Sequence, residues 1–268
     1  MKEKITFSFG KNWQDFLKTL TKEKIKNAEI SIKDFMGVTE FTDKSVIDIG
    51  CGSGIFSYVM FKMNAKKIVS FDVDPFSVKC CEFMHKKAGN PKKWVFHQGS
   101  ILDDAFISNL GKFDIVYSWG VLHHTGKMWD AIKKSAQLVN KGGYYYIAIY
   151  NKGDGMFGPK FWLGIKKFYN AHPFIGKYIF ETGYILAFFA LNLVKLRNPF
   201  KQIRDYKQNR GMSWRRDIAD WLGGYPYEYA TIEEIFNFMK SNFPDFQLIN
   251  VKSVNRLSNN WYLFKRNN

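Results

Sequence analysis

The stretch Val46–Ser57, VIDIGCGSGIFS, decides the fold. Apart from Asp48, the run Val46–Ile49 is apolar and β-branched, which predicts a short buried strand. Residues Gly50–Gly54 follow at once and predict a sharp turn where a ligand can approach the backbone. The apolar residues of Ile55–Phe61 predict the first turns of a helix. A strand, a glycine turn and a helix in this order open a doubly wound α/β sheet, with a nucleotide-like ligand over the carboxyl end of the strand.

The spacing of the glycines separates two classes of ligand. A dinucleotide fingerprint is G-x-G-x-x-G, and its third glycine would fall at Ile55 or Ser57. The pattern present is D-x-G-x-G-x-G, with Asp48 inside the strand. A buried carboxylate is costly unless it meets hydrogen-bond donors or a cation, so an ammonium group or ordered turn amides suit it better than a pyrophosphate. The pattern resembles the first motif of the class I S-adenosylmethionine (SAM) methyltransferases, and later motifs of that family follow in order.

The second predicted strand, Ile68–Phe71, ends at Asp72. Asp72 lies 18 positions beyond Gly54, close to the spacing of about 20 residues expected for an acid that accepts hydrogen bonds from both ribose hydroxyls. Asp74, which precedes Pro75, is expected to cap a helix instead.

A third strand is predicted at Trp94–Phe96. In the resembled family the following turn places a small polar and an apolar residue beside adenine, and Ser100 and Ile101 match that role. Asp103 is a candidate acceptor for the adenine amine. The resemblance therefore implies SAM as the cofactor and S-adenosylhomocysteine as its product. The expected cofactor contacts are Asp48, Gly50, Cys51, Gly52, Gly54, Asp72, Val73, Ser100, Ile101, Ser118 and Trp119.

Two histidines, His123 and His124, follow the fourth predicted strand, Phe113–Tyr117. Methyl transfer from a sulfonium expels a neutral thioether, so the enzyme must align donor and acceptor and, for a hydroxyl acceptor, remove a proton. Histidine suits that role near neutral pH. Either histidine can instead cap or buttress the next helix, and Trp119 can pack in the protein instead of facing the sulfonium. The five histidines form no obvious metal-binding set, so no metal is expected.

The rest of the core continues the same pattern. A helix is predicted at Met128–Val139 and a fifth strand at Tyr144–Tyr150, where Tyr150 and Asn151 are candidate substrate contacts. Thr231 and Glu234 form a predicted capping box. The last two strands, expected at 246–251 and 261–264, form an antiparallel pair in the resembled family.

Residues 153–225 stand apart from this pattern. They carry 12 lysines and arginines against 5 acidic residues. We interpret them as a helical lid that builds the acceptor pocket, with attachment to an anionic membrane surface as the alternative. The apolar run Tyr184–Leu191 is shorter than a spanning helix and favours a buried helix or a dimer contact. The segment that closes the insertion mixes charged and aromatic residues, as carbohydrate or phosphate pockets do: Arg215, Arg216, Asp217, Asp220, Trp221 and Tyr227.

Composition sets the remaining limits. With 46% hydrophobic residues among 268, the chain can bury a core, and disorder is not expected. The net charge of +16 favours anionic partners, although a lysine-rich solvated surface explains it equally well. Three cysteines without metal-ligand spacing and an N-terminus without a long apolar run predict a cytoplasmic protein, with peripheral membrane contact as an alternative. Residues 1–45 predict helices, and in the resembled family such a segment often covers the cofactor.

These features together predict a doubly wound, Rossmann-like seven-stranded sheet with an antiparallel last strand. Residues 1–152 and 226–268 form the SAM-binding core, and residues 153–225 form the lid between strands five and six. The expected activity is O-methylation of a small-molecule hydroxyl, on a sugar or a phosphorylated metabolite, with a histidine base. Alternatives are a quinone or lipid-linked acceptor at the membrane surface, or a non-catalytic SAM-binding protein. Nucleic acid is not expected as a partner, because no RNA-binding module is recognisable.

Overall fold

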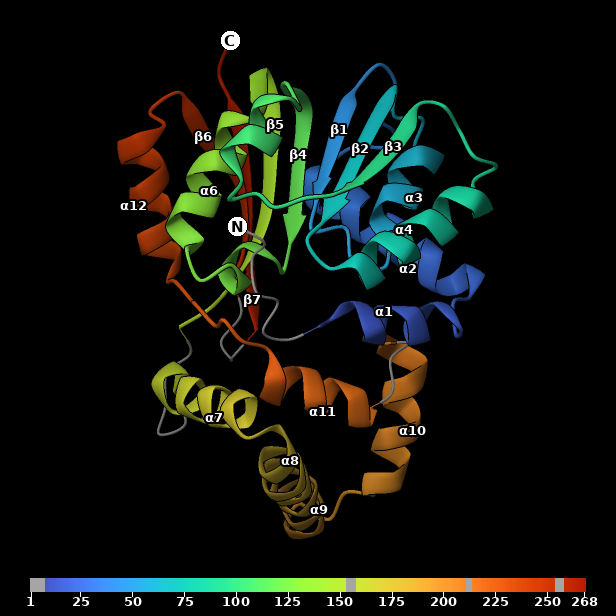
Figure 1. The fold of residues 1–268 in the computed structure, drawn as a ribbon, viewed down its shortest axis with the longest axis vertical. Coiled ribbons are helices and arrows are strands. Elements are labelled where there is room, and N and C mark those ends of the chain that lie inside the picture. Colours follow the sequence, from blue (N-terminus) through green and yellow to red (C-terminus); the bar gives the residue numbers. More distant parts are fainter. Residues whose placement is uncertain (1–7, 153–157, 211–213, 254–257) are drawn as a thin grey trace.

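The computed structural model describes residues 8–152, 158–210, 214–253 and 258–268. Its centre is a seven-stranded sheet in the order β3-β2-β1-β4-β5-β7-β6 (Figure 1). Strands β1 to β5 are parallel, and β7 runs antiparallel to both of its neighbours. The strands are β1 (Ser45–Ile49), β2 (Lys67–Asp72), β3 (Trp94–Gln98), β4 (Phe113–Trp119), β5 (Val139–Tyr150), β6 (Phe246–Lys252) and β7 (Asn259–Arg266). The predicted fold class, with its reversed last strand, is confirmed.

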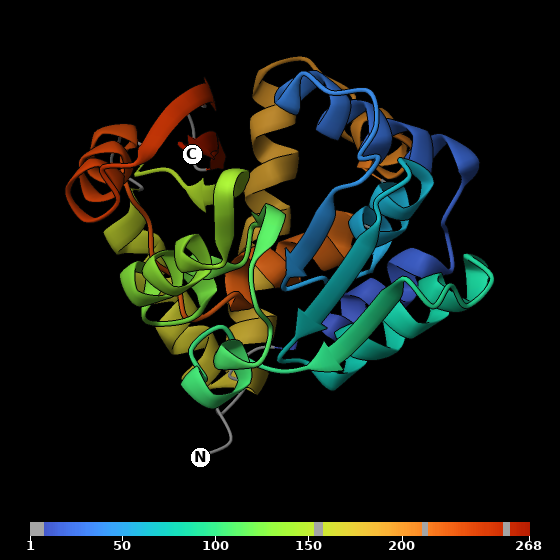
Figure 2. The same ribbon diagram turned by 90° about the horizontal axis from the view of Figure 1, so that it is seen from above.

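Helices cover both faces of the sheet (Figures 1 and 2). One face packs against α2 (Lys22–Met36), α3 (Ile55–Lys62) and α4 (Pro75–Lys87). The other packs against α6 (Met128–Gln137) and α12 (Ile232–Asn242). Burial on both faces explains why the central strands read as continuous apolar runs. The short helices are α1 (Gly10–Leu17) and α5 (Asp104–Ser108), with a 3-10 turn at Leu122–His124.

The insertion forms a helical lid at the carboxyl ends of the parallel strands (Figure 1). It comprises α7 (Pro159–Ala171), α8 (Pro173–Gly176), a π-helical turn (Lys177–Glu181), α9 (Thr182–Val194), α10 (Pro199–Arg210) and α11 (Trp214–Gly223). Tyr169, Ile218 and Leu222 form its small buried core. The chain rejoins the core where the Ala230 amide donates to the Tyr150 carbonyl at 3.0 Å.

Two predictions about elements are wrong. The helix expected at Met128–Val139 ends at Gln137, because Val139 already pairs with Phe113 and β5 therefore begins five residues earlier than predicted. The apolar run Tyr184–Leu191 is not a buried helix, since Leu186 is 64% exposed and only the side facing the lid is covered. The predicted capping box is confirmed: the Thr231 hydroxyl accepts from the Glu234 amide, and the Glu234 carboxylate accepts from the Thr231 amide.

Candidate functional site

The glycine turn after β1 has a backbone that only glycine adopts easily. Gly50, Gly52 and Gly54 have φ angles of 71°, 52° and 73°. A Cβ at Gly50 would lie 2.4 Å from the Val121 side chain. A Cβ at Gly54 would lie 2.8 Å from the Cα of Cys81, where α3 and α4 approach each other. The turn, called the glycine cradle below, therefore needs glycine both for its backbone angles and for its close packing against Val121 and α4.

Asp72, at the end of β2, faces this turn. Its Oδ2 accepts from the Gly52 amide at 3.0 Å, and its Oδ1 accepts from the Asp74 amide at 2.9 Å. The turn itself is tied to β2, because the amides of Gly50 and Cys51 both donate to the Phe71 carbonyl. Burial raises the pKa of Asp72 to about 6, although the two amides oppose that shift. The carboxylate stands where a ligand seated on the turn would meet it.

Asp48 lies beneath the turn, in a buried polar chain. Its carboxylate accepts from the Ser57 hydroxyl, which lies 2.7 Å from the Ser70 hydroxyl, and Ser70 accepts from Trp94 Nε1 at 2.9 Å. Burial raises the pKa of Asp48 to about 7. This network joins β1, α3, β2 and β3, so Asp48 supports the turn from behind.

The third side of the site comes from the ends of β2 and β3. The Ser100 hydroxyl accepts from the Leu102 amide at 3.1 Å, and Ile101 is buried below it. Asp103 caps α5 by accepting from the Phe106 amide. Val73 is exposed beside Asp72. Ser100 and Ile101 thus lie at the same edge of the sheet as Asp72, and their contact with adenine stays a prediction.

Two residues at the end of β4 have different environments. Ser118 is fully buried, and its hydroxyl donates to the Ile49 carbonyl at 3.1 Å, which fixes β4 to β1. Trp119 is 36% exposed, and its ring lies 6.0 Å from Trp261 and 6.5 Å from Phe56. Trp119 is therefore the member of this pair with surface available to a ligand.

Helix α1 covers the turn. The Ser8 hydroxyl and the Gly10 amide donate to Asp74 Oδ2 at 2.7 and 2.8 Å, while Asp74 Oδ1 caps α4 by accepting from the Phe76 amide. A Cβ at Gly52 would lie 3.0 Å from Trp13 Nε1. The cap role predicted for Asp74 is confirmed. Its contact with the N-terminal segment was not predicted, because residues so far apart in the chain give no local signal.

The two histidines at the β4 rim are held as opposite tautomers. His123 is fully buried, and its Nδ1 accepts from the Tyr150 amide at 3.3 Å, so its proton is on Nε2. His124 Nδ1 lies 2.6 Å from the Pro226 carbonyl, which can only accept, so this proton is on Nδ1 and Nε2 is the free acceptor. Burial lowers the pKa of His124 to about 4 and holds that of His123 well below its usual value. Both rings are therefore neutral at pH 7.

The lid faces the histidines with a cationic aromatic cluster. Lys166 is fully buried, donates to the Trp221 carbonyl, and lies 4.5 and 4.9 Å from the ring centres of Trp221 and Tyr227. The Tyr150 ring bridges to the core, 4.0 Å from His123 and 5.2 Å from Tyr227. Burial lowers the pKa of Lys166 to about 7. Among the described residues, His123 Nε2 and the Tyr227 hydroxyl are buried with no hydrogen-bond partner.

Some of these residues were predicted from the sequence, and others were not. Tyr150, Trp221 and Tyr227 were predicted near the acceptor, and they do meet at the rim. Asn151 accepts from the Asn260 amide group at 3.1 Å. Lys166 was not predicted as a site residue, because nothing local in the sequence shows that it is buried. The side chain of Arg216 lies outside the described part of the chain.

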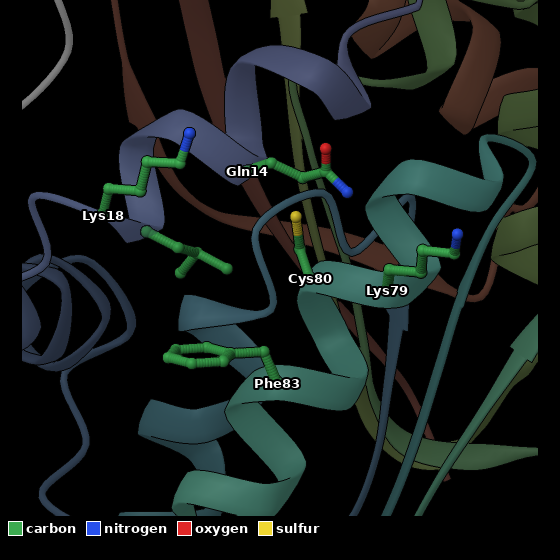
Figure 3. Close-up of a pocket in the computed structure, with 6 residues that line it drawn as sticks. Gln14, Lys18, Lys79, Cys80 and Phe83 are labelled. Atoms are coloured by element: carbon green, nitrogen blue, oxygen red, sulfur yellow. The ribbon is translucent and has the colours of Figure 1, made fainter.

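A surface hollow lies elsewhere, between α1 and α4 (Figure 3). Its volume is about 390 Å³, and it is lined by Gln14, Leu17, Lys18, Lys79, Cys80 and Phe83. None of the predicted site residues lines it, so it is separate from the glycine turn and the histidine rim. Within the described residues, no group of three histidine, cysteine, aspartate or glutamate side chains is placed to hold a metal ion.

A glycine cradle over β1, an acid at the end of β2 and a sheet in the order 3-2-1-4-5-7-6 define the class I SAM-dependent methyltransferase fold. Residues 40–165 match the family described as "Methyltransferase domain". The chain thus carries a domain of that class, as predicted.

Comparisons with known proteins agree on the domain. The tRNA U34 carboxymethyltransferase of Pseudomonas aeruginosa (strain LESB58) is 32% identical over 104 residues, which are 39% of this chain and 31% of that protein. The Campylobacter jejuni subsp. doylei protein of the same name is 28% identical over 136 residues, or 50% of this chain and 41% of that protein. The match therefore spans less than half the length of these curated relatives.

Solved structures share the fold at low sequence identity. Magnesium protoporphyrin IX methyltransferase from Synechocystis PCC 6803 has a TM-score of 0.52 and 14% identity, covering 91% of this chain and 82% of that one. An O-methyltransferase family protein from Burkholderia thailandensis has a TM-score of 0.55 and 12% identity, covering 91% of this chain and 57% of that one. These likenesses concern the fold alone.

Proposed function

We propose that the protein transfers the methyl group of SAM to a hydroxyl group of a small sugar-like or phosphorylated acceptor, with His124 as the base. The observation that carries this proposal is the histidine pair: two neutral imidazoles of opposite tautomer at the rim of a methyltransferase domain. One ring offers a proton acceptor and the other a proton donor.

The residues of the cradle fit SAM, which supplies a methyl group on a sulfonium that leaves as a neutral thioether. The backbone of Gly50–Gly54 would lie against the ligand, since the turn carries no bulky side chain on its glycines. Asp72 would accept from the ribose hydroxyls, since a carboxylate can accept more bonds than the two it has here. Ser100 and Ile101 would flank adenine, and the exposed face of Trp119 would attract the positive sulfonium.

His124 has the properties of a base for a hydroxyl acceptor. Its Nδ1 proton is fixed by Pro226, which leaves Nε2 to take the proton of the attacking hydroxyl. His124 is half-buried, whereas His123 is fully buried. His123 Nε2–H would donate to the acceptor oxygen and orient it.

The lid cluster supports an anionic acceptor. Because the pKa of Lys166 lies at about 7, the side chain is partly neutral at neutral pH. A phosphate or carboxylate beside it would favour the charged form and gain an ion pair in a site shielded from water. Trp221 and Tyr227 offer flat apolar surfaces of the kind that stack on sugar rings.

A tRNA acceptor is the second candidate. The curated relatives are named for tRNA, and a net charge of +16 favours binding to a polyanion. We rank it second because Trp221 of the lid and Tyr227, which follows it, lie near the histidines but outside the matched residues 40–165.

The test measures transfer of a tritiated methyl group from SAM to four probes: monosaccharides, sugar phosphates, a quinol and unfractionated tRNA. We expect labelling of a sugar or sugar phosphate. We expect His124→Gln to lower turnover by about 10²- to 10⁴-fold, because general-base catalysis contributes that much. His123→Gln is the matched variant, with a smaller loss expected because it removes a hydrogen bond to the acceptor.

Calorimetry with S-adenosylhomocysteine checks that both variants remain folded, with affinity expected within about twofold of wild type, since neither ring belongs to the cradle. Wild-type turnover in His124→Gln would reject the base. Labelling of tRNA alone would favour the second candidate.

A further inference from the structure

The lid carries an apolar helix that the protein leaves largely uncovered. Phe174–Val194 runs continuously through α8, the π-helical turn and α9 for 21 residues. Its mean hydropathy is 1.4, and only 11% of its most apolar 18-residue stretch is buried. A core helix of this composition would be mostly buried. This helix lies at the edge of the lid farthest from the sheet (Figure 1).

Its outer face forms one continuous apolar surface. Leu186, Leu193 and Val194 are 64%, 76% and 80% exposed on α9. The surface continues at Phe174, which is 77% exposed, and at Leu196, which is 95% exposed. Exposed apolar side chains that gather in this way mark an interaction surface, whereas scattered ones need no explanation.

The inner face is fixed to the rest of the lid. The Tyr169 hydroxyl donates to Glu181 at 2.7 Å, and the Phe188 ring lies 4.7 Å from Trp214. Gln202 donates to Asn192 at 2.5 Å. At 1.5 Å per residue the helix is about 31 Å long, which equals the thickness of a bilayer core. Its contacts with α7, α10 and α11 nevertheless hold it flat against the lid.

The charges around the helix are almost all positive. Residues 174–204 contain five lysines and arginines and a single acid, Glu181, which is buried and bonded to Tyr169. Lys177 precedes the apolar surface, Lys195 and Arg197 follow it, and all three are exposed. Basic residues that border an apolar helical face are typical of helices lying in the interface of an anionic membrane.

We propose that the outer face of Phe174–Val194 docks on the surface of an anionic lipid bilayer, with the helix in the plane of the interface. The apolar side chains enter the acyl boundary, and the flanking lysines and arginines contact the headgroups. Charge complementarity favours this partner over a second copy of the chain, because two such faces would bring their basic borders together.

The full-length protein is tested by sedimentation with vesicles. We expect binding to an equal mixture of phosphatidylcholine and phosphatidylglycerol at low salt, and weak binding to phosphatidylcholine alone. High salt should weaken binding to the mixture, because surface charges are screened. Leu186→Ser with Leu193→Ser should lower vesicle affinity by about a hundredfold, since each leucine contributes about tenfold when buried.

The matched control is Phe236→Ser with Ile249→Ser, which removes two exposed apolar side chains on α12 and β6. It should bind vesicles like wild type. Both variants should keep wild-type affinity for S-adenosylhomocysteine, which separates this test from that of the proposed function. Failure of wild type to bind the mixed vesicles at low salt would overturn the proposal. A second result would also overturn it. Light scattering would show a dimer that the two leucine substitutions disrupt, while vesicle binding of that variant stays at the wild-type level.

Discussion

At the scale of single residues, three aspartates near the glycine turn have three different roles. Asp48 sits below the turn with a serine, Asp72 faces it with two amides, and Asp74 caps α4 and anchors the N-terminal segment. Each follows a predicted strand or lies within one, so the sequence motifs predicted where they lie. The partners that distinguish them are distant in sequence and follow only from the fold.

Asp48 gives a prediction about pH. Its pKa is about 7 in the folded protein and about 3.9 in an unfolded chain, so between these values only the folded state binds the proton. The stability that this proton contributes is therefore lost as pH rises towards 7. Asp48→Asn removes this pH dependence. The free energy of unfolding of the variant minus that of wild type should therefore rise by about 2 kcal/mol between pH 5 and pH 8. Urea unfolding of the cofactor-free protein measures this difference, in which the histidine contributions cancel. A difference that does not change with pH would contradict the burial of an ionisable Asp48.

At the scale of elements, α4 and α5 both begin with an aspartate N-cap, but the two aspartates make different numbers of contacts. Asp74 and Asp103 each accept from an amide in the first turn of their own helix, α4 and α5. Only Asp74 also accepts from Ser8 and Gly10. A local cap can be read from sequence, whereas a cap that also holds a distant helix cannot.

This pair allows a matched test. Asp103→Ala should lower the free energy of unfolding by about 1 kcal/mol, the usual value of an N-cap, and Asp74→Ala should lower it by more, because Asp74 also accepts from Ser8 and Gly10. In addition, Asp74→Ala should speed amide hydrogen exchange in α1, because it removes both hydrogen bonds that fix the start of that helix. Mass spectrometry of the exchanged protein reads both effects. Equal exchange of α1 in the two variants would show that Asp74 does not hold it.

At the scale of the whole molecule, the cover of the glycine turn and the lid touch each other. Asn12 of α1 donates to Asp220 of α11, and the Phe9 ring lies 5.0 Å from His124. Helix α1, which covers the glycine turn, thus contacts both the lid and the histidine rim.

We therefore expect S-adenosylhomocysteine to slow hydrogen exchange in α11, a helix that contributes no cradle residue. Asn12→Ala should reduce this slowing several-fold while the cradle still binds the ligand, because one buried contact is worth about 1 kcal/mol. Asn242→Ala, which removes an exposed helical side-chain hydrogen bond, is the control and should leave the slowing unchanged. Slowing of equal size in Asn12→Ala would show that cover and lid are independent.

The sequence predicts those parts of the structure that depend on residues close together in the chain. The strand, turn and helix of Val46–Phe61 are set by neighbouring residues, and so is the capping box at Thr231. The start of β5 depends on Phe113, which is distant in sequence, and was missed. The apolar run in the lid shows in composition, but whether another element covers it depends on packing.

The place where the lid joins the core has an evolutionary consequence. The chain rejoins the core beside the histidines, where the Glu228 amide donates to the His123 carbonyl and the Ala230 amide donates to the Tyr150 carbonyl at the end of β5. Closing a longer or shorter loop between such fixed points costs little free energy. The segment between these points can therefore change in length during evolution while the sheet keeps its arrangement.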